Sequence, residues 1–213
     1  MKQVSAISEL IEVAHAAAKE KGFWDGEHNL GERLMLIVSK CGEALEAHRK
    51  GKRADLSRYS DLHEDDFVEF SSLSFQVNIK DTFEDELAGI VIRIADLCGS
   101  LDHTDVAKMF RTIHTTTVNT ERIFSGDEDT SQWGLMDMAQ IPSHENVGEA
   151  RLSVCEAVVH AGSRWVHHPL NNLTIAMSRV VSIAKAHNID LLRHINLKLA
   201  YNATRPKLHG KAY

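Results

Sequence analysis

Three short stretches of this chain combine residue types that could do phosphate chemistry. Residues 42–50 and 83–93 carry glutamates in helix-forming, apolar sequence, where an ionised carboxylate needs a partner such as a metal ion. Glu43 and Glu46 are three residues apart, so on a helix both side chains lie on one face. Residues 198–206 add cationic and amide side chains that could hold a phosphate or a base. Together the three stretches favour a divalent-metal site for a nucleotide polyphosphate.

The carboxylates have two competing interpretations. Glu43, Glu46 and Glu86 offer hard oxygen ligands, which suit Mg²⁺ or, in its place, Mn²⁺. A metal ion held in this way polarises a phosphoryl oxygen and activates a bound water. Alternatively, Glu43 and Glu46 belong to a solvated helix face and pair with Arg49 and Lys50. The pattern of this one helix leaves both interpretations open.

The composition is that of a globular, helical protein. The chain has 213 residues, which is enough for one core or for two small, closely packed halves. Hydrophobic residues make up 43% and charged residues 25%, as in ordinary soluble domains. Only three prolines, few aromatic residues and abundant Ala, Leu, Ile and Glu favour an all-α fold over a sheet. The net charge of −6 argues against binding to duplex nucleic acid.

Cysteine usage and hydropathy indicate the compartment. Cys41, Cys98 and Cys155 are odd in number, far apart in the sequence and surrounded by apolar residues, so we expect reduced core thiols. The N-terminal residues lack the apolar run of a signal peptide. No stretch approaches the ~18 apolar residues of a membrane span. We therefore expect a cytoplasmic protein that does not bind membranes.

Hydrophobic spacing predicts several helices. An amphipathic first helix should stop at Gly22, and a helix over residues 81–100 is apolar on most sides, which predicts burial. The last helix should begin at Asp190 as its N-cap and end before Pro206. Residues 52–80 read as a long excursion with one short helix, and residues 126–143 as a linker. Further helices are predicted over about residues 30–50, 104–126, 148–165 and 170–187.

The whole chain, residues 1–213, is expected to form one domain with two related halves. Residues 1–126 carry the acidic motifs, and residues 144–213 echo them weakly. In this echo Val159 stands opposite Glu46, and Asn172 stands opposite Glu86, so the second half would have lost its acids. A degenerate internal duplication and chance similarity between apolar helices explain the echo equally well.

The order of these motifs resembles the MazG-like, all-α nucleoside triphosphate pyrophosphohydrolases. The resemblance covers about residues 5–102 and 188–213. It implies a helical bundle of that type, association as a homodimer, and Mg²⁺-dependent hydrolysis of nucleoside triphosphates to monophosphate and pyrophosphate. The residues that it assigns are Glu43, Glu46 and Glu86 as metal-binding and catalytic residues, and Lys198, Asn202 and Arg205 as substrate contacts. Trp24 is a candidate for stacking on a base, but taken alone a core or interface tryptophan is its more common role.

Two positions depart from the family's pattern. The family usually has acidic residues where this chain has Lys40 and Gly89, so two of four expected acidic ligands are absent. Asp85 is expected to point elsewhere on its helix, and Asp96 lies about three turns beyond Glu86, so neither is a convincing replacement. Arg93 lies seven residues after Glu86 on the same face and is expected to pair with a buried acid.

The sequence thus supports two functions. The leading one is a Mg²⁺-dependent nucleoside triphosphate pyrophosphohydrolase that acts on an NTP or a dNTP. The alternative is a catalytically impaired relative that binds nucleotides as a sensor, sponge or regulator. In this alternative Lys40 contacts the phosphates directly, and Gly89 opens room for them.

Overall fold

The computed structural model describes residues 3–27, 29–61, 72–101, 147–162 and 169–210, and their regular elements are helices, as predicted. The predicted helix over 104–126 and the predicted linker over 126–143 lie outside the described residues. The long helices are α1 (Ile7–Glu20), α2 (Leu30–Arg49), α5 (Phe83–Ser100), α7 (Val147–Ala161), α8 (Pro169–Ala186) and α9 (Leu191–Thr204). The short ones are α3 (Leu56–Asp61), α4 (Ser72–Asn78) and the 3₁₀ helix η4 (Lys207–Gly210).

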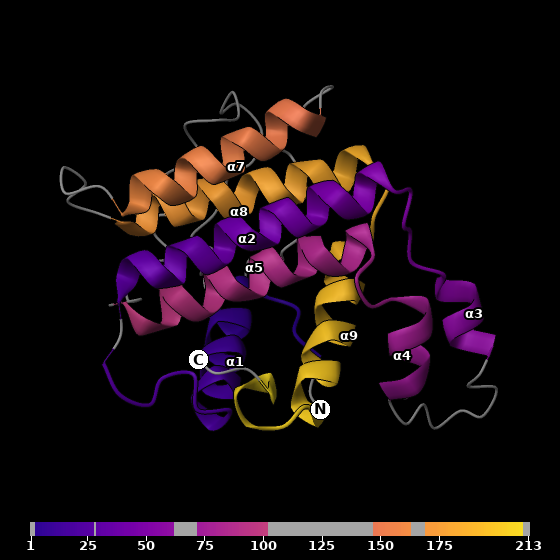
Figure 1. The fold of residues 1–213 in the computed structure, drawn as a ribbon, viewed down its shortest axis with the longest axis horizontal. Helices are drawn as coiled ribbons and strands as arrows, with labels where there is room; N and C mark the ends of the chain where they lie inside the picture. Colours follow the sequence, from indigo (N-terminus) through magenta and orange to yellow (C-terminus); the bar gives the residue numbers. More distant parts are fainter. Residues whose placement is uncertain (1–2, 28, 62–71, 102–146, 163–168, 211–213) are drawn as a thin grey trace, which may run out of the picture.

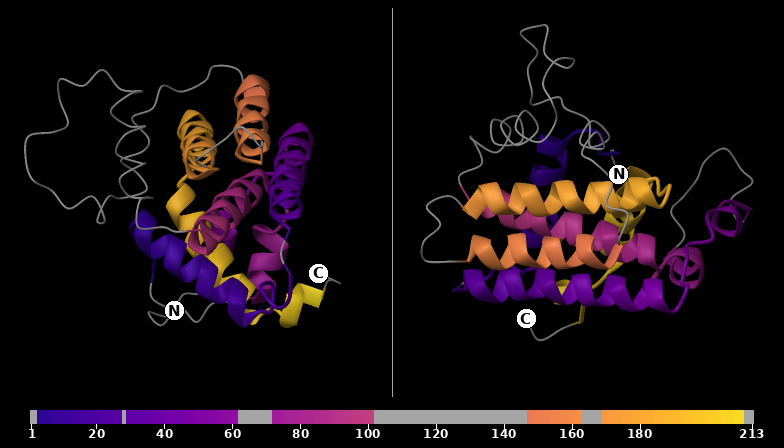
Figure 2. Two further views of the ribbon diagram at one scale, coloured as in Figure 1. Left: turned by 90° about the vertical axis from the view of Figure 1, so that its left-hand side faces the viewer. Right: turned by 90° about the horizontal axis from the view of Figure 1, so that it is seen from above.

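The long helices form two layers around α5. Helices α2, α5, α7 and α8 run side by side, and α1 and α9 cross α5 on its other side (Figures 1 and 2). Helix α5 packs against α1, α2, α8 and α9, so it is the centre of the described fold. The short helices α3 and α4 lie together at one end (Figure 1). No described helix is both long and apolar enough to cross a membrane.

The sequence of α5 explains its central place. Thr82 caps the helix, because its side-chain oxygen accepts a hydrogen bond from the backbone N–H of Asp85 at 3.3 Å. Of its 18 residues, 13 are buried, and the prediction of a buried helix over residues 81–100 is confirmed. Three of these buried residues are the acids Glu84, Asp85 and Glu86 in the first turn, where the helix dipole favours negative charge. An apolar helix therefore carries a cluster of carboxylates into the interior.

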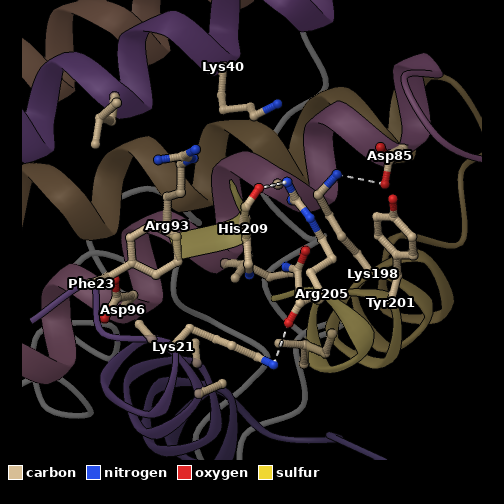
Figure 3. Close-up of a pocket in the computed structure, with 18 of the residues that line it drawn as sticks. Lys21, Phe23, Lys40, Asp85, Arg93, Asp96, Lys198, Tyr201, Arg205 and His209 are labelled. Atoms are coloured by element: carbon tan, nitrogen blue, oxygen red, sulfur yellow. Dashed lines mark hydrogen bonds and ion pairs between the residues drawn. The ribbon is translucent and has the colours of Figure 1, made fainter. Parts of the chain in front are cut away.

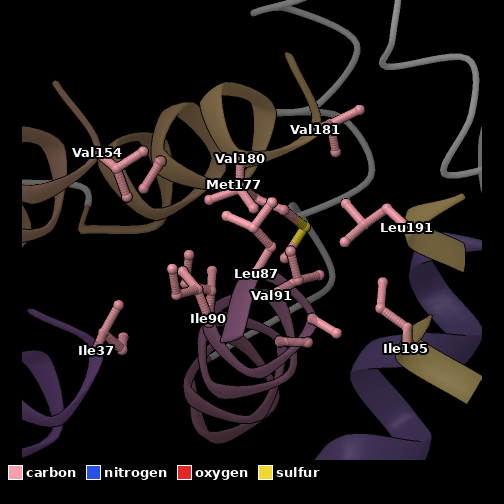
Figure 4. Close-up of a cluster of buried hydrophobic side chains, with 14 of the residues drawn as sticks. Ile37, Leu87, Ile90, Val91, Val154, Met177, Val180, Val181, Leu191 and Ile195 are labelled. Carbon is pink, nitrogen blue, oxygen red and sulfur yellow. The ribbon is translucent and has the colours of Figure 1, made fainter. Parts of the chain in front are cut away.

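One hydrophobic core joins the first and last parts of the chain. Leu87 of α5 is fully buried, and Figure 4 shows it packed among side chains from neighbouring helices. Met177 of α8, Ile37 of α2 and Ile195 of α9 belong to the same core cluster. A smaller cluster of Tyr59, Phe75 and Ile79 attaches α3 and α4 to α9. The internal duplication and the chance similarity of apolar helices stay equal alternatives.

The ends of the helices follow the sequence closely. Helix α1 ends before Gly22, whose φ of +79° suits glycine, and the carboxylate of Asp190 caps α9 by accepting from Arg193 N at 3.0 Å. Helix α9 ends at Thr204, two residues before Pro206. These three predictions are confirmed. The excursion over residues 52–80 is more regular than predicted, since it contains two short helices in its described part instead of one.

Two of the three cysteines lie closer together than their positions in the sequence suggest. Cys41 of α2 is buried, and its thiol forms a hydrogen bond with that of Cys155 on α7. This hydrogen bond lowers the pKa of Cys155 to about 7. Burial raises the pKa of Cys98 to about 12. Cys98 is therefore an inert core thiol as expected, whereas Cys155 is half-buried and ionises more readily.

Candidate functional site

A pocket of about 380 Å³ lies where α1, α2, α5 and α9 meet (Figure 3). Its volume is in the range of small-molecule sites. Its lining includes most of the residues proposed from the sequence: Lys40, Glu43, Glu86, Gly89, Lys198, Asn202 and Arg205. These residues come from positions more than 150 residues apart, and the packing of α9 against α5 brings them together.

The charge of the lining differs from that of the whole chain. Seven lysines and arginines line the pocket, against six aspartates and glutamates. The chain as a whole carries a net charge of −6, so the pocket is locally more positive than the rest of the protein. The lining is therefore close to charge balance, with one cation in excess, and it accepts an anion more readily than the acidic remainder of the protein.

Lys40 lies between two of the expected metal ligands. Its Nζ is 2.7 Å from Oε2 of Glu86, and it also donates a hydrogen bond to Oε2 of Glu43. Burial alone opposes the charge on Lys40, but Glu86 and Glu43 outweigh this effect and raise the pKa of the lysine above its usual value. The same hydrogen bond from Lys40 lowers the pKa of Glu43 against the opposing effect of burial. An ammonium group therefore bridges α2 and α5 through these carboxylates.

Gly89 makes room for the side chain of Lys198. A Cβ atom at this position would lie 3.1 Å from Cε of Lys198 and 3.6 Å from Cδ of Lys40. The first distance is tighter than an ordinary van der Waals contact. Lys198 thus passes close over the backbone of α5 and reaches Asp85, with Nζ 2.7 Å from Oδ1. The two departures from the family's pattern, Lys40 and Gly89, are neighbours in space and belong to one arrangement.

Three carboxylates form a cluster at the start of α5. Oxygen atoms of Asp81, Asp85 and Glu86 all lie within 4.8 Å of one another, a spacing that a metal ion could bridge. The expectation that Asp85 points elsewhere is wrong, because Asp85 lines the pocket. Asp85 and Gly89 are four residues apart and share a helix face, so this spacing could have predicted that Asp85 lines the pocket. Asp81, which the sequence did not single out, joins the cluster through its backbone N–H, which donates to Asp85 Oδ2 at 3.1 Å.

Each carboxylate of this cluster faces a lysine. Asp81 pairs with Lys80 at 3.0 Å, whereas the partners of Asp85 and Glu86 are Lys198 and Lys40, each at 2.7 Å. A divalent cation that bound all three carboxylates would displace three ammonium groups.

Arg93 differs from Lys40 and Lys198 in its contacts. Its guanidinium has no hydrogen-bond or ion-pair partner among the described residues, so the expected pair with a buried acid is absent from them. Burial lowers the pKa of Arg93, and the charges of Glu43, Glu86 and Asp96 offset this effect only in part. Those acids are engaged elsewhere, the two glutamates by Lys40 and Asp96 by other side chains. Figure 3 shows Arg93 and Lys40 directed into the same pocket.

The C-terminal residues close the pocket on the side of α9. Arg205 Nη2 donates to the carbonyl oxygen of His209 at 3.1 Å, and its guanidinium lies 5.8 Å from the ring centre of Tyr201. Lys21, at the end of α1, donates to the carbonyl oxygens of Ala203 and Arg205 at 2.8 and 2.7 Å. These bonds hold the end of α9 against α1 (Figure 3). One part of the wall is apolar and comprises Ala14, Ala17, Ala18, Phe23, Leu36 and Ile92.

Two residues proposed from the sequence lie outside the pocket lining. Glu46 faces outward and pairs with Arg49 at 3.2 Å and with Lys50 at 3.0 Å, as in the solvated-face interpretation. The indole Nε1 of Trp24 donates to Oδ1 of Asp96 at 2.8 Å, and His15 Nδ1 lies 2.9 Å from the same oxygen. Trp24 therefore helps to hold Asp96 in place.

This donor set does not fit the magnesium site that the resemblance implies. Of the three expected carboxylate ligands, Glu43 and Glu86 are bound to the Lys40 ammonium, and Glu46 is not in the pocket. Gly89 has no side chain to contribute. Because a divalent cation is held mainly by the negative charge around it, an ammonium among its ligands opposes its binding.

Comparisons with models of protein families, with curated proteins and with solved structures find nothing that matches this chain.

Proposed function

We propose that the pocket binds the phosphate chain of a nucleotide. The single observation that carries this proposal is Arg93, a half-buried guanidinium with no hydrogen-bond or ion-pair partner among the described residues, whose burial nearby acids offset only in part. Burial of such a charge costs stability unless an anion compensates it, and a phosphate oxygen is an anion that a guanidinium binds well. Lys40, Lys198 and Arg205 approach the same space and add charge for a second or third phosphate.

The shape and chemistry of the pocket support a nucleotide over inorganic phosphate. A volume of about 380 Å³ exceeds what one phosphate needs, and the apolar wall around Phe23 and Leu36 suits a base or sugar. Asn202 offers an amide that can donate and accept hydrogen bonds, as the recognition of a base requires. The resemblance to MazG-like enzymes in the sequence points to the same class of ligand. The homodimer that this resemblance implies stays a prediction.

A second candidate is the Mg²⁺-dependent pyrophosphohydrolase itself. One observation favours it, namely the cluster of Asp81, Asp85 and Glu86, whose spacing suits a metal ion. It requires the lysine partners of these carboxylates to move away. Nucleotide binding without turnover is the simpler consequence of the present arrangement.

Isothermal titration calorimetry with ATP, pyrophosphate and adenosine tests the proposed function. We expect ATP and pyrophosphate to bind, and adenosine to bind at least tenfold more weakly than ATP, because the phosphates make the charged contacts. The titrations are run with EDTA and, separately, with Mg²⁺, and binding in either buffer supports the proposal. Adenosine that binds as tightly as ATP, or no binding of ATP and pyrophosphate in both buffers, would refute it.

An assay of pyrophosphate release decides the second candidate. Turnover of a nucleoside triphosphate that needs Mg²⁺ and is lost in Asp85→Asn would establish the hydrolase. Binding without turnover across the ribo- and deoxyribonucleotides would leave the protein as a nucleotide-binding relative.

A further inference from the structure

We infer that the Lys40 ammonium takes the role of the divalent cation, so that the pocket binds phosphate chains without a metal ion. This inference rests on the proposed function, because it specifies the form of the nucleotide that the pocket accepts. The form is the metal-free polyphosphate, and Mg²⁺ is a competitor for it.

Lys40 lies where two carboxylates meet. Glu43 and Glu86 come from different helices, and their carboxylates converge on Nζ of Lys40. The lysine side chain is only 15% exposed and that of Glu86 is 3% exposed, so this contact is made inside the protein. An ammonium group has three N–H donors. Two are used by the glutamates, and the third remains for a ligand in the pocket.

Lys40, Gly89 and Lys198 are neighbours in the pocket. A lysine at position 40 alone would only prevent a metal ion from binding. Here Gly89 on the facing helix α5 also leaves space for the side chain of Lys198. Lys198 forms an ion pair with Asp85, and Lys40 forms one with Glu86, each at 2.7 Å, so two ammonium groups hold two of the three buried acids of this helix turn. The negative charge that would attract a metal ion is thereby neutralised from within the chain, and Arg93 keeps a guanidinium for the ligand.

The charge balance predicts the effect of Mg²⁺ on binding. Mg²⁺ binds the phosphate chain of free ATP and cancels two of its negative charges. A pocket that offers ammonium and guanidinium groups binds the more highly charged, metal-free form better, because its contacts are charge–charge contacts. A pocket that offers free carboxylates shows the opposite dependence, since it needs the metal ion as a bridge.

The wild-type protein provides the first test. We expect the affinity for ATP and for pyrophosphate, measured by calorimetry, to be about tenfold lower with Mg²⁺ in excess of the ligand than with EDTA. An affinity that rises with Mg²⁺, or that changes less than twofold, would overturn the inference. Such results leave the proposed function intact, whereas the absence of binding in both buffers refutes the proposed function itself.

Lys40→Met provides the second test, with Lys50→Met as its matched control. Lys50 lies just after the same helix, is 59% exposed and is outside the pocket, so its removal should leave binding unchanged. Lys40→Met should lower the affinity for metal-free ATP about tenfold and reverse the effect of Mg²⁺, because Glu43 and Glu86 become available to a metal ion. Thermal unfolding establishes that both variants are folded. A folded Lys40→Met protein that binds ATP like the wild type and is still weakened by Mg²⁺ would overturn the inference.

Discussion

Arg93→Met should weaken ATP binding about a hundredfold and at the same time make the protein more stable. The loss of affinity corresponds to the ~2–3 kcal/mol of a charge-assisted contact between a guanidinium and a phosphate. The gain in stability follows because the half-buried guanidinium has no partner among the described residues, while methionine fills similar space without a charge. We expect the free energy of unfolding to rise by about 1 kcal/mol.

Two further variants sharpen this test. Arg49→Met removes an arginine that is 71% exposed and paired with Glu46 outside the pocket, so both binding and stability should stay as in the wild type. Arg93→Lys keeps the charge but loses the planar fork of donors, and its affinity should fall between those of wild type and Arg93→Met. Calorimetry gives the affinities, and urea unfolding gives the stability. If Arg93→Met destabilises the protein and leaves binding intact, Arg93 is a structural residue and not a ligand contact.

Lys40→Glu combined with Gly89→Asp should convert the pocket from one that Mg²⁺ weakens into one that requires Mg²⁺. The pair adds two carboxylates beside Glu43 and Glu86 and removes the ammonium that binds them. A Cβ atom at position 89 comes closest to Cε of Lys198, at 3.1 Å, and this flexible side-chain end has to move by a few tenths of an ångström. We expect the affinity for Mg²⁺ alone, measured by calorimetry, to rise at least tenfold, because the local charge changes by three units.

Lys50→Glu combined with Gly42→Asp is the matched control. It introduces the same change in charge at exposed positions of the same helix region, and neither residue lines the pocket. Its affinity for Mg²⁺ should stay close to that of the wild type.

The assay of pyrophosphate release, applied to the pocket pair Lys40→Glu with Gly89→Asp, also separates the two candidate functions. If the wild type already hydrolyses nucleotides through Asp81, Asp85 and Glu86, the pocket pair should leave turnover unchanged or lower it; a decayed catalyst should instead gain turnover.

The sequence predicted the elements of the fold well because their determinants are local. The buried helix over residues 81–100 is apolar on most sides, and the ends of α1 and α9 are set by Gly22, Asp190 and Pro206. The excursion over residues 52–80 was predicted less well. Its helices are short, and their few apolar residues pack against α9 far along the chain, so local periodicity carries little information about them.

The membership of the candidate site was partly predictable, but the partners within it were not. The resemblance suggested that Lys40, Glu43 and Glu86 belong to one site, and all three line the same pocket. The pairing of Lys198 with Asp85 depends on how α9 crosses α5, which no local pattern encodes. Packing also explains why Arg93 lacks the expected ion pair. The two glutamates nearest to Arg93, Glu43 and Glu86, form their hydrogen bonds with Lys40 instead.

Trp24 and Glu46 illustrate the limit of motif-based assignment. Both were candidate site residues in the sequence, Glu46 through the resemblance and Trp24 through its residue type, and both have other contacts in the structure. Trp24 donates its indole N–H to Asp96, and Glu46 pairs with two exposed basic residues on the outer face of α2. A sequence motif can predict the helix on which a residue lies. Whether its side chain faces the pocket depends on how the helices pack.

The most direct test of the central claim, that this pocket holds a nucleotide's phosphate chain, is a crystal structure of the protein with ATP in metal-free buffer. We predict phosphate oxygens within hydrogen-bond distance of the Arg93 guanidinium and of Lys40 Nζ, with the base against the apolar wall around Phe23 and Leu36. ATP bound at another surface, or a pocket without nucleotide at saturating ATP, would contradict the claim.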